Sequence, residues 1–231
     1  MRNYIRSRAP LRIGIAGGGT DVDPYASTKG GYVFNTTINK YAYCTLTPRD
    51  DRIMNVHSHY YGRYQTSLGN GPLVLDGNMD LIKAVANHFD IDHGLDLEMH
   101  SDVPAGSGLG GSSTLSVSMI MAVTKWIGED IDKYAKARLA YKLEREVIGL
   151  KGGRQDQYAS VFGGFNCMEF KGDSALVTPL YLSTDTINEL QCRSVLCFTG
   201  VSRESADIIE TQITSYKKGD NEAALDASKV I

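Results

Sequence analysis

The stretch LDLEMHSDVPAGSGLGGSSTLSVSMIMAVTKWIG, residues 95–128, carries three local patterns in one run. Residues 95–101 alternate apolar and polar side chains, which is typical of a β-strand with one buried face. Residues 112–128 are apolar or small on nearly every side, which predicts a helix buried all round. Between them, Gly106, Gly108 and Gly111 match G-x-G-x-x-G, a pattern associated with phosphate binding. The order of strand, glycine turn and helix therefore predicts an anion site at a helix N-terminus.

Several known phosphate loops can be compared with this stretch. A Walker A loop ends in lysine, and no lysine follows the glycines before Lys125, so that loop is excluded. A protein-kinase glycine loop is followed by VAIK and HRD signatures, which this chain lacks. A dinucleotide loop needs a buried parallel strand and a βαβ unit, which the alternating strand at 95–101 disfavours. The simplest alternative is a tight turn with a serine cap, although four glycines in residues 106–111 exceed what a cap needs.

Composition narrows the class of protein. The chain has 231 residues, 42% hydrophobic residues and a net charge of −3, which fits a globular protein with a real core. It has no basic stripe, so we expect neither nucleic acid nor an anionic membrane as a partner. No apolar run reaches membrane-spanning length and the N-terminus resembles no signal peptide, so we expect a cytoplasmic protein. The cysteines, Cys44, Cys167, Cys192 and Cys197, have neither CxxC nor zinc spacing and are expected to be free thiols.

The elements predicted along the chain favour an α+β fold with antiparallel strands over a doubly wound parallel sheet, because strands come first and helices follow. Strands are expected at 8–16, 31–38, 40–47, 52–61, 95–101, 164–170, 175–182 and 193–200. Helices are expected at 78–89, 112–128, 131–150, 154–162 and 202–218, with a last one beginning near residue 221.

Three charged residues stand out from their surroundings. Glu144 lies within an apolar stripe of the predicted helix 131–150, where an unpaired carboxylate is costly, so it needs a cation such as Mg²⁺ or a salt bridge, for example to Arg138. Asp156 begins a short helix and is either a first-turn acid or a general base beside a phosphate site. Arg12 lies in an apolar strand before a second glycine run and is either a surface residue or part of that site.

Taken together, these residues resemble the GHMP kinases, the superfamily that includes galactokinase, homoserine kinase and mevalonate kinase. The resemblance rests on RAPLRIGIAGGGTDVDPY at 8–25, on PAGSGLGGSST at 104–114, and on Glu144 standing twelve residues before Asp156-Gln157. AGGGTD, GGYVFNTTINKYAY and CFTGVSRESADI look closest to the bacterial D-glycero-D-manno-heptose 7-phosphate kinases. Gly18 and Gly19 stand where galactokinase-like proteins have Glu-His, which argues against galactose as substrate.

The resemblance also implies a domain organisation. Residues 1–190 would form the ATP-binding domain of GHMP kinases, with a ribosomal-protein-S5-like fold, and residues 191–231 would begin a ferredoxin-like second domain. Family members carry a third glycine-rich motif, and none is present in these 231 residues. We therefore expect the second domain to be incomplete in this chain.

Roles for individual residues follow from the resemblance. ATP and Mg²⁺ are the implied cofactors, and a sugar phosphate is the implied substrate. Asp156 would accept the proton of the sugar hydroxyl, and Arg12 would steady Asp156 and the transferring phosphoryl group. Ser112, with Ser113 as a second candidate, and Glu144 would hold Mg²⁺. The ATP phosphates would lie on Gly106, Ser107, Gly108, Leu109, Gly110, Gly111, Ser112 and Ser113, and the sugar on Asp21, with Thr20 and Asp23 as weaker candidates.

Two further pairs of residues lie outside these motifs. Ser202 and Arg203 follow a predicted strand and a glycine at the start of a helix, so they are candidates to hold the second phosphate of a sugar phosphate; the alternative is a capped helix with a surface arginine. His57 and His59 share one strand face, but no acidic or thiol partner is evident, so we interpret them as surface residues rather than metal ligands.

Three other functions stay open at this point. A kinase for a free sugar such as fucose would lack the second phosphate site. A non-catalytic nucleotide-binding module is disfavoured by the presence of Arg12, Glu144 and Asp156 together. An NAD-dependent dehydrogenase would have to respond to NADH rather than to ATP with Mg²⁺.

Overall fold

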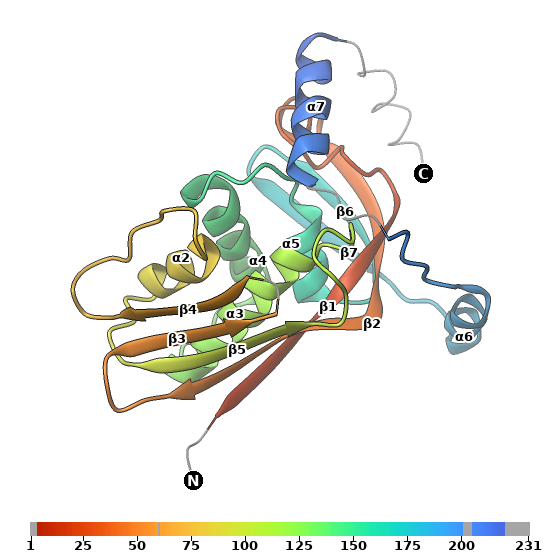
Figure 1. The fold of residues 1–231 in the computed structure, drawn as a ribbon. Helices are drawn as coiled ribbons and strands as arrows, with labels where there is room; N and C mark the ends of the chain where they lie inside the picture. Colours follow the sequence, from red (N-terminus) through yellow and green to blue (C-terminus); the bar gives the residue numbers. More distant parts are fainter. Residues whose placement is uncertain (1–3, 60, 201–204, 220–231) are drawn as a thin grey trace.

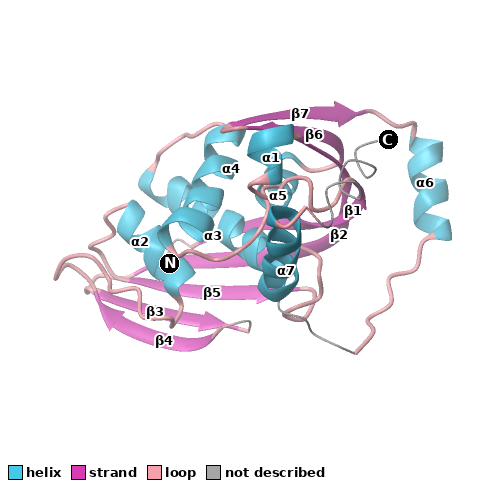
Figure 2. Cartoon of the chain, turned by 90° about the horizontal axis from the view of Figure 1, so that it is seen from above, coloured by secondary structure: helices cyan, strands magenta, loops and turns pink. Residues whose placement is uncertain are grey.

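A computed structural model of the chain describes residues 4–59, 61–200 and 205–219, with no side-chain description for residues 205–208. One mixed sheet forms its base, and helices α2 to α5 cover one face of that sheet (Figures 1 and 2). The strands are β1 (Ile5–Ala16), β2 (Gly31–Pro48), β3 (Ile53–Ser58), β4 (Gly62–Ser67), β5 (Leu95–Ser101), β6 (Phe165–Lys171) and β7 (Ser174–Leu180). The α-helices are α1 (Tyr25–Lys29), α2 (Asp80–His88), α3 (Gly111–Ile127), α4 (Lys133–Tyr141), α5 (Gln155–Phe162), α6 (Thr184–Arg193) and α7 (Ser205–Lys217), and the π-helix η1 spans Lys142–Val147.

The long strand β2 organises the sheet. It pairs with β1 along most of its length, with β6 through its first half and with β5 through its second half. The order β4-β3-β5-β2-β6-β7 is antiparallel at every described pairing except β3 with β5. The predicted α+β class with antiparallel strands is therefore confirmed, and the doubly wound alternative is excluded.

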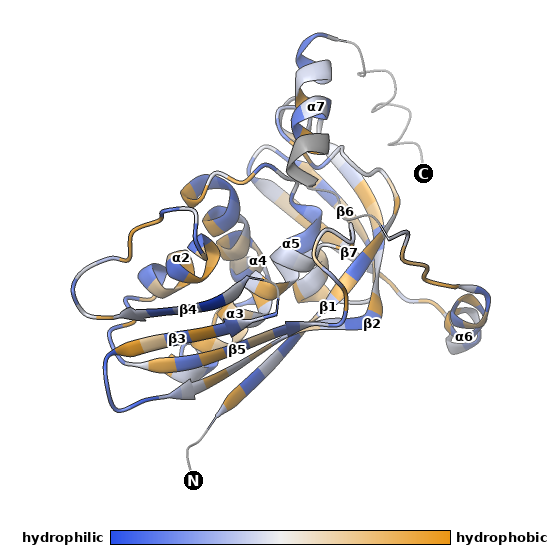
Figure 3. Cartoon of the chain, in the orientation of Figure 1, coloured by the Kyte–Doolittle hydropathy of each residue, from blue (hydrophilic) through white to orange (hydrophobic). Residues whose placement is uncertain are grey.

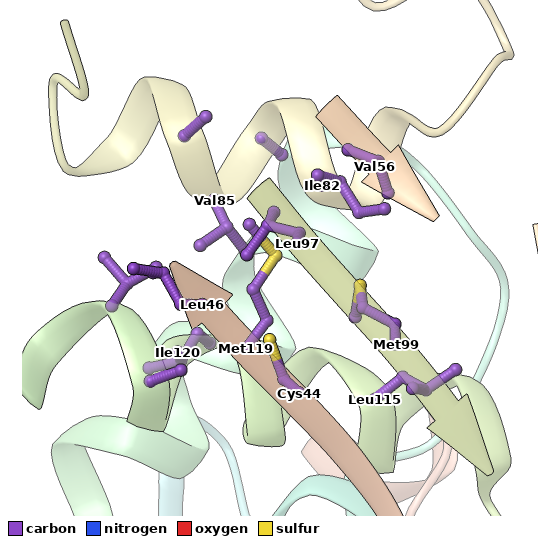
Figure 4. Packing of buried hydrophobic residues seen from close by; sticks show 14 of the residues in the cluster. Cys44, Leu46, Val56, Ile82, Val85, Leu97, Met99, Leu115, Met119 and Ile120 are labelled. Carbon is purple, nitrogen blue, oxygen red and sulfur yellow. The ribbon is translucent and has the colours of Figure 1, made fainter. Parts of the chain in front are cut away.

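The main core lies between the sheet and helices α2 and α3. Leu97 of β5 lies beside Val85 of α2 and Met119 of α3, and Met99 lies near Leu115 of α3 (Figure 4). Leu115, Met119 and Ile120 are fully buried, as the apolar pattern of residues 112–128 predicts. This packing fixes α3 against the sheet and so fixes the glycine loop that precedes it.

Two predictions for the first half of the chain need correction. The strands expected at 31–38 and 40–47 are one continuous strand, β2, because its partner β1 spans both segments. The strand expected at 52–61 is shorter than predicted: β3 ends at Ser58, and a turn then leads into β4, which was not predicted. The amide of Tyr61 donates to the hydroxyl of Ser58, and Gly62 has a φ of 90°, so the chain reverses there.

The second predicted helix, 131–150, is also divided. It begins as α4 with Asp132 as its N-cap, whose carboxylate accepts from the amide of Ala135. It then widens into the π-helix η1, in which the amide of Ile148 donates to the carbonyl of Leu143. A π turn adds one residue to the helix, and such turns occur frequently at functional sites.

The strand expected at 193–200 is wrong. Residues 184–193 form α6, which Ser183 caps through the amide of Thr186, and residues 194–200 form neither helix nor strand. Apolar side chains such as Val195 and Phe198 are exposed, and Figure 3 shows apolar colour along the segment that follows α6. No strand in the described part of the chain lies beside it to complete a ladder, so strand propensity is not realised. The helix expected from residue 221 lies outside the described residues.

Helix α7 returns to the body of the molecule. Its Tyr216 ring meets Tyr25 edge-on at 5.3 Å, and its hydroxyl lies 3.0 Å from that of Thr28. Nε2 of Gln212 donates to the carbonyl of Gly19 at 3.0 Å. These contacts dock α7 on the loop that follows β1, which brings it to the edge of the site described next.

Candidate active site

The glycine loop forms one wall of a pocket of about 530 Å³. Gly106, Gly108 and Gly110 have φ values of 70°, 75° and 76°, a conformation that favours glycine over residues with a Cβ atom. Helix α3 begins at Gly111, so its first amide groups and its positive dipole end face the pocket. The rest of the pocket is lined by residues from β1, from the loop after β1, from η1, from the start of α5 and from α7.

Arg12 and Asp156 meet within this pocket. Nε of Arg12 donates to Oδ1 of Asp156 at 2.6 Å, and its Nη1 donates to the carbonyl of Gly108 at 2.8 Å. Burial acts to lower the pKa of Arg12, but the Asp156 carboxylate outweighs it and the pKa is raised. A Cβ atom at Gly110 would lie 3.1 Å from Cγ of Asp156, so glycine there leaves room for the carboxylate. One arginine thus joins the carboxylate of α5 to the glycine loop.

Glu144 lies at the base of the pocket and is 1% exposed. Its Oε2 accepts from the hydroxyl of Ser113 at 2.7 Å and from Nε2 of Gln157 at 2.5 Å. Its Oε1 is buried and has no hydrogen-bond partner among the described residues. Burial raises the pKa of Glu144 against the opposing effects of Arg145, Ser113 and Gln157.

The salt-bridge alternative for Glu144 involves a different arginine from the one considered in the sequence. Nη2 of Arg145 lies 3.4 Å from Oε2 of Glu144, whereas Arg138 is exposed on α4. Ser112, the other predicted metal ligand, lines the same pocket, and its hydroxyl lies 2.9 Å from that of Tyr61. Ser113 therefore contacts Glu144 directly, while Ser112 faces Tyr61.

Asp21 lines the pocket and also caps α5. Its Oδ2 accepts from the backbone amide of the N-cap residue Arg154 at 2.8 Å and from that of Gln155, the first residue of the helix, at 2.9 Å. Burial raises its pKa, the amide of Gln155 opposes that effect, and the charge of Asp156 adds to it. A Cβ atom at Gly153 would lie 2.0 Å from Oδ2 of Asp21, so this contact requires glycine.

The two weaker sugar candidates have other partners. Thr20 is fully buried, and its hydroxyl contacts the backbone oxygens of Gly17 and Tyr32 at 2.8 and 2.9 Å. Asp23 accepts from Nη2 of Arg154 at 2.8 Å. Within the described part of the chain, neither side chain lines the pocket. Ser202 and Arg203 lie outside the described residues.

Several pocket residues carry no local sequence signal. Arg145 and Lys151 add positive charge, and Ile209 and Gln212 reach the pocket from α7. In the sequence, Gln212 is one polar position in a long amphipathic helix, and such positions are too common to predict a binding site. Tyr61 ends the run HSHYY, and nothing in that run indicates that it lines the pocket.

The histidines interpreted as surface residues are exposed on the face of the sheet that lacks helices. The rings of His57 and His59 lie 5.5 Å apart, and His59 meets His100 at 5.3 Å. No group of three metal-ligating side chains is found within residues 4–59, 61–200 and 205–219. In the same part of the chain, no helix is both long and apolar enough to cross a membrane.

Comparison with known proteins provides independent information. Residues 79–164 match the family model of the GHMP kinases N terminal domain. The chain is 42% identical, over 98% of its length, to D-glycero-alpha-D-manno-heptose 7-phosphate kinase of Campylobacter jejuni, and it spans 68% of that protein. It is 28% identical to a bifunctional fucokinase/GDP-fucose pyrophosphorylase of Arabidopsis thaliana, over 92% of the chain and 22% of that protein.

Solved structures agree with these relatives. The fold superposes on a D-glycero-D-manno-heptose 1-phosphate kinase from Bacteroides thetaiotaomicron with a TM-score of 0.76 and 35% identity, over 94% of this chain and 74% of that one. A mevalonate kinase from Methanococcus jannaschii has the same fold, with a TM-score of 0.62 at 15% identity, over 95% of this chain and 72% of that one. The predicted fold class is thus confirmed by structure as well as by sequence.

Proposed function

The chain belongs to the GHMP kinase family, and from this premise we propose that it transfers the γ-phosphoryl group of ATP to the anomeric hydroxyl of a sugar phosphate. The preferred substrate is D-glycero-D-manno-heptose 7-phosphate, the substrate in the name of the Campylobacter relative. The observation that carries the proposal is the 2.6 Å contact between Arg12 and Asp156, formed at the glycine loop inside one pocket.

The glycine loop and the start of α3 would bind the β- and γ-phosphates of ATP. Backbone amides of residues 106–113 are available there because the first amides of a helix have no partner within it. The positive end of the helix dipole favours the same negative charge. Residues 1–190 would thus supply the nucleotide site, and residues from 191 onward would begin the second domain, which reaches the pocket through α7.

Mg²⁺ fits the residues at the base of the pocket. Glu144 has a buried oxygen without a hydrogen-bond partner in the described chain, and Ser113 contacts its other oxygen. A hard cation that prefers oxygen ligands would satisfy that oxygen. We assign Glu144 and Ser112 as the ligands that hold it, with Ser113 as the alternative hydroxyl. When bound, Mg²⁺ would neutralise charge on the phosphates.

Asp156 is the proposed general base. A phosphoryl transfer requires little covalent chemistry from the protein, so positioning and charge account for most of the rate. Arg12 holds the carboxylate at 2.6 Å and keeps positive charge beside the glycine loop, where charge develops on the transferring group. Asp156 would accept the proton of the sugar hydroxyl as the oxygen attacks phosphorus.

The acceptor would lie beside Asp21, close to the first turn of α5. Asp21 lines the pocket while it caps α5, so the sugar and the base would share one anchor. Ser202 and Arg203 remain our proposal for the phosphate of the sugar phosphate, and Thr20 and Asp23 would support the loop around Asp21. Because ATP is the phosphoryl donor, we expect the protein to act in the cytoplasm.

The test is ADP release with ATP and Mg²⁺ against four acceptors: heptose 7-phosphate, mannose 6-phosphate, fucose and galactose. Asp156→Asn removes the base, and Asp173→Asn, in an exposed hairpin turn, is the matched control. We expect turnover on the heptose phosphate that is lost with Asp156→Asn and kept with Asp173→Asn. Turnover on fucose alone would leave a kinase without a second phosphate site. Binding of ATP without turnover on any acceptor would leave only a nucleotide-binding module.

A further inference from the structure

Arg145 and its neighbour in the sequence, Glu144, both line the pocket, which is unusual for adjacent residues of a helix. In an α-helix, consecutive side chains point about 100° apart, so adjacent residues seldom face one cavity. Here both residues belong to the π-helix η1, where the amide of Ile148 bonds to the carbonyl of Leu143, five residues back. The additional residue in the turn reduces the angle between successive side chains. The wide turn therefore presents a carboxylate and a guanidinium to the same pocket.

The guanidinium of Arg145 is largely buried and makes only long contacts. Its side chain is 14% exposed, its Nη1 lies 3.3 Å from the carbonyl of Lys151, and its Nη2 lies 3.4 Å from Glu144. Its Nε is buried and has no partner among the residues that the structure describes. Arg12, by contrast, meets its carboxylate at 2.6 Å. A buried donor without a close acceptor is costly, so the arrangement is suited to a ligand that supplies acceptor oxygens.

Gly152 makes room for this arginine. A Cβ atom at Gly152 would lie 2.3 Å from both Cζ and Nη2 of Arg145. The backbone of Gly152 does not have a positive φ, so the demand for glycine comes from the guanidinium rather than from the turn. The adjacent Lys151 also lines the pocket. The loop between η1 and α5 therefore holds positive charge in the pocket that the glycine loop also lines.

The two arginines of the pocket are paired to different degrees. Arg12 lies 2.6 Å from Asp156, whereas Arg145 lies 3.4 Å from Glu144, so among the described lining residues the guanidinium of Arg145 is the more available to an anionic ligand. A planar guanidinium with donors in a fork matches the oxygens of a phosphoryl group.

We propose that Arg145 is a phosphoryl-binding residue of this pocket, held in place by η1 and by the space at Gly152. The inference rests on the proposed function, in which phosphoryl groups enter the pocket on two molecules. Its ligand is a phosphate oxygen, carried either by the terminal phosphate of the nucleotide or by the phosphate of the acceptor sugar. Binding of separate probes distinguishes these two sources.

The test is isothermal titration of the whole chain with ADP·Mg, with AMP-PNP·Mg, and with heptose 7-phosphate in the presence of ADP·Mg. The first variant, Arg145→Gln, removes the positive charge. The second variant, Gly152→Ala, keeps that charge but displaces the guanidinium of Arg145. Arg138→Gln, on the exposed face of α4, is the matched control. Thermal unfolding of each variant shows whether it is folded.

We expect Arg145→Gln and Gly152→Ala to weaken one probe at least tenfold while Arg138→Gln binds like the unaltered chain. Selective loss of AMP-PNP over ADP identifies the terminal phosphate of the nucleotide, and selective loss of heptose 7-phosphate identifies the acceptor. Equal weakening of all three probes, unchanged binding of all three, or no binding by the unaltered chain overturns the inference.

The same variants separate this inference from the proposed function. Turnover by the unaltered chain together with unchanged binding in Arg145→Gln leaves the kinase proposal intact and removes the role of Arg145. If AMP-PNP binding depends on Arg145 but no acceptor leads to ADP release, the role of Arg145 in binding phosphate is kept and the kinase proposal is removed.

Discussion

Nε of Arg12 donates a 2.6 Å hydrogen bond to Oδ1 of Asp156, across 144 positions of sequence. The same guanidinium donates through Nη1 to the carbonyl of Gly108. Strand β1, helix α5 and the glycine loop are therefore held together by one side chain. Its fork geometry is needed for both bonds, because a lysine presents a single charged nitrogen.

We predict that Arg12→Lys lowers kcat by about 10²-fold, the loss typical of one missing donor to transition-state charge. The KM for ATP should change much less, because the loop amides that bind phosphate are retained. Steady-state kinetics measure both quantities. Arg8→Lys, an exposed position on the same strand over the ring of Tyr41, is the control. Equal kcat in the two variants would show that the fork is unnecessary.

Asp21 provides a prediction about stability as well as activity. It accepts from two amides at the start of α5, so Asp21→Ala should cost about 1 kcal/mol of unfolding free energy, as lost helix caps do. Asp21→Asn keeps one acceptor oxygen and should cost less. Urea unfolding measures both variants, and a smaller loss for alanine than for asparagine contradicts the capping role.

Gly153 tests the same contact from its other side. Gly153→Ala should push its Cβ atom against Oδ2 of Asp21 and displace α5 with Asp156, so kcat should fall together with stability. Gly18→Ala is the matched control, because its Cβ atom would meet nothing within 4 Å. If Gly153→Ala behaves like Gly18→Ala in urea unfolding and in turnover, the close approach has no functional consequence.

Gln212 links α7 to the loop after β1, beside the proposed acceptor site. Gln212→Leu removes the 3.0 Å hydrogen bond to the carbonyl of Gly19, a loss of about 1 kcal/mol. We therefore expect the KM of the sugar phosphate to rise about fivefold while the KM of ATP stays within twofold. Gln191→Leu, on the exposed helix α6, is the control for the substitution itself. A rise in the KM of ATP equal to that of the sugar phosphate would place the effect outside the acceptor side.

The family and the fold class were predictable because their signals are local. The glycine loop, Arg12, Glu144 and Asp156 each lie in a short motif, and the motifs keep fixed spacings along the chain. The structure brings all four features to one pocket, whereas their catalytic roles stay predictions. Burial of Glu144 also followed from the apolar stripe around it.

Other features depend on contacts that the sequence does not display. The π turn places Arg145 in the pocket, yet residues 131–150 read as one regular α-helix. Gln212 reaches the site because α7 docks on the loop after β1 through contacts such as Tyr216 on Tyr25, which join segments nearly two hundred residues apart. The strand predicted at 193–200 failed because strand propensity needs a neighbouring strand, and none lies beside that segment in the described chain.

The four free thiols differ in exposure, and that difference gives a prediction about pH. Cys44 is fully buried on β2, and burial raises its pKa from 9.0 to about 12. Its thiol therefore ionises in the unfolded chain before it ionises in the folded one. Between pH 9 and 12 the unfolded state holds fewer protons, so the free energy of unfolding falls as the pH rises.

We predict that the unaltered chain loses about 2 kcal/mol more unfolding free energy between pH 8 and pH 10.5 than Cys44→Ala does. Other titrating groups are shared by the two proteins and cancel in that difference, and the cavity left by alanine costs the same at each pH. Urea unfolding at both pH values measures it. Thiol labelling at pH 8 gives a second readout, because the exposed Cys192 and Cys197 should react in the folded chain while Cys44 reacts only after unfolding. Labelling of Cys44 at the rate of Cys192 would contradict its burial.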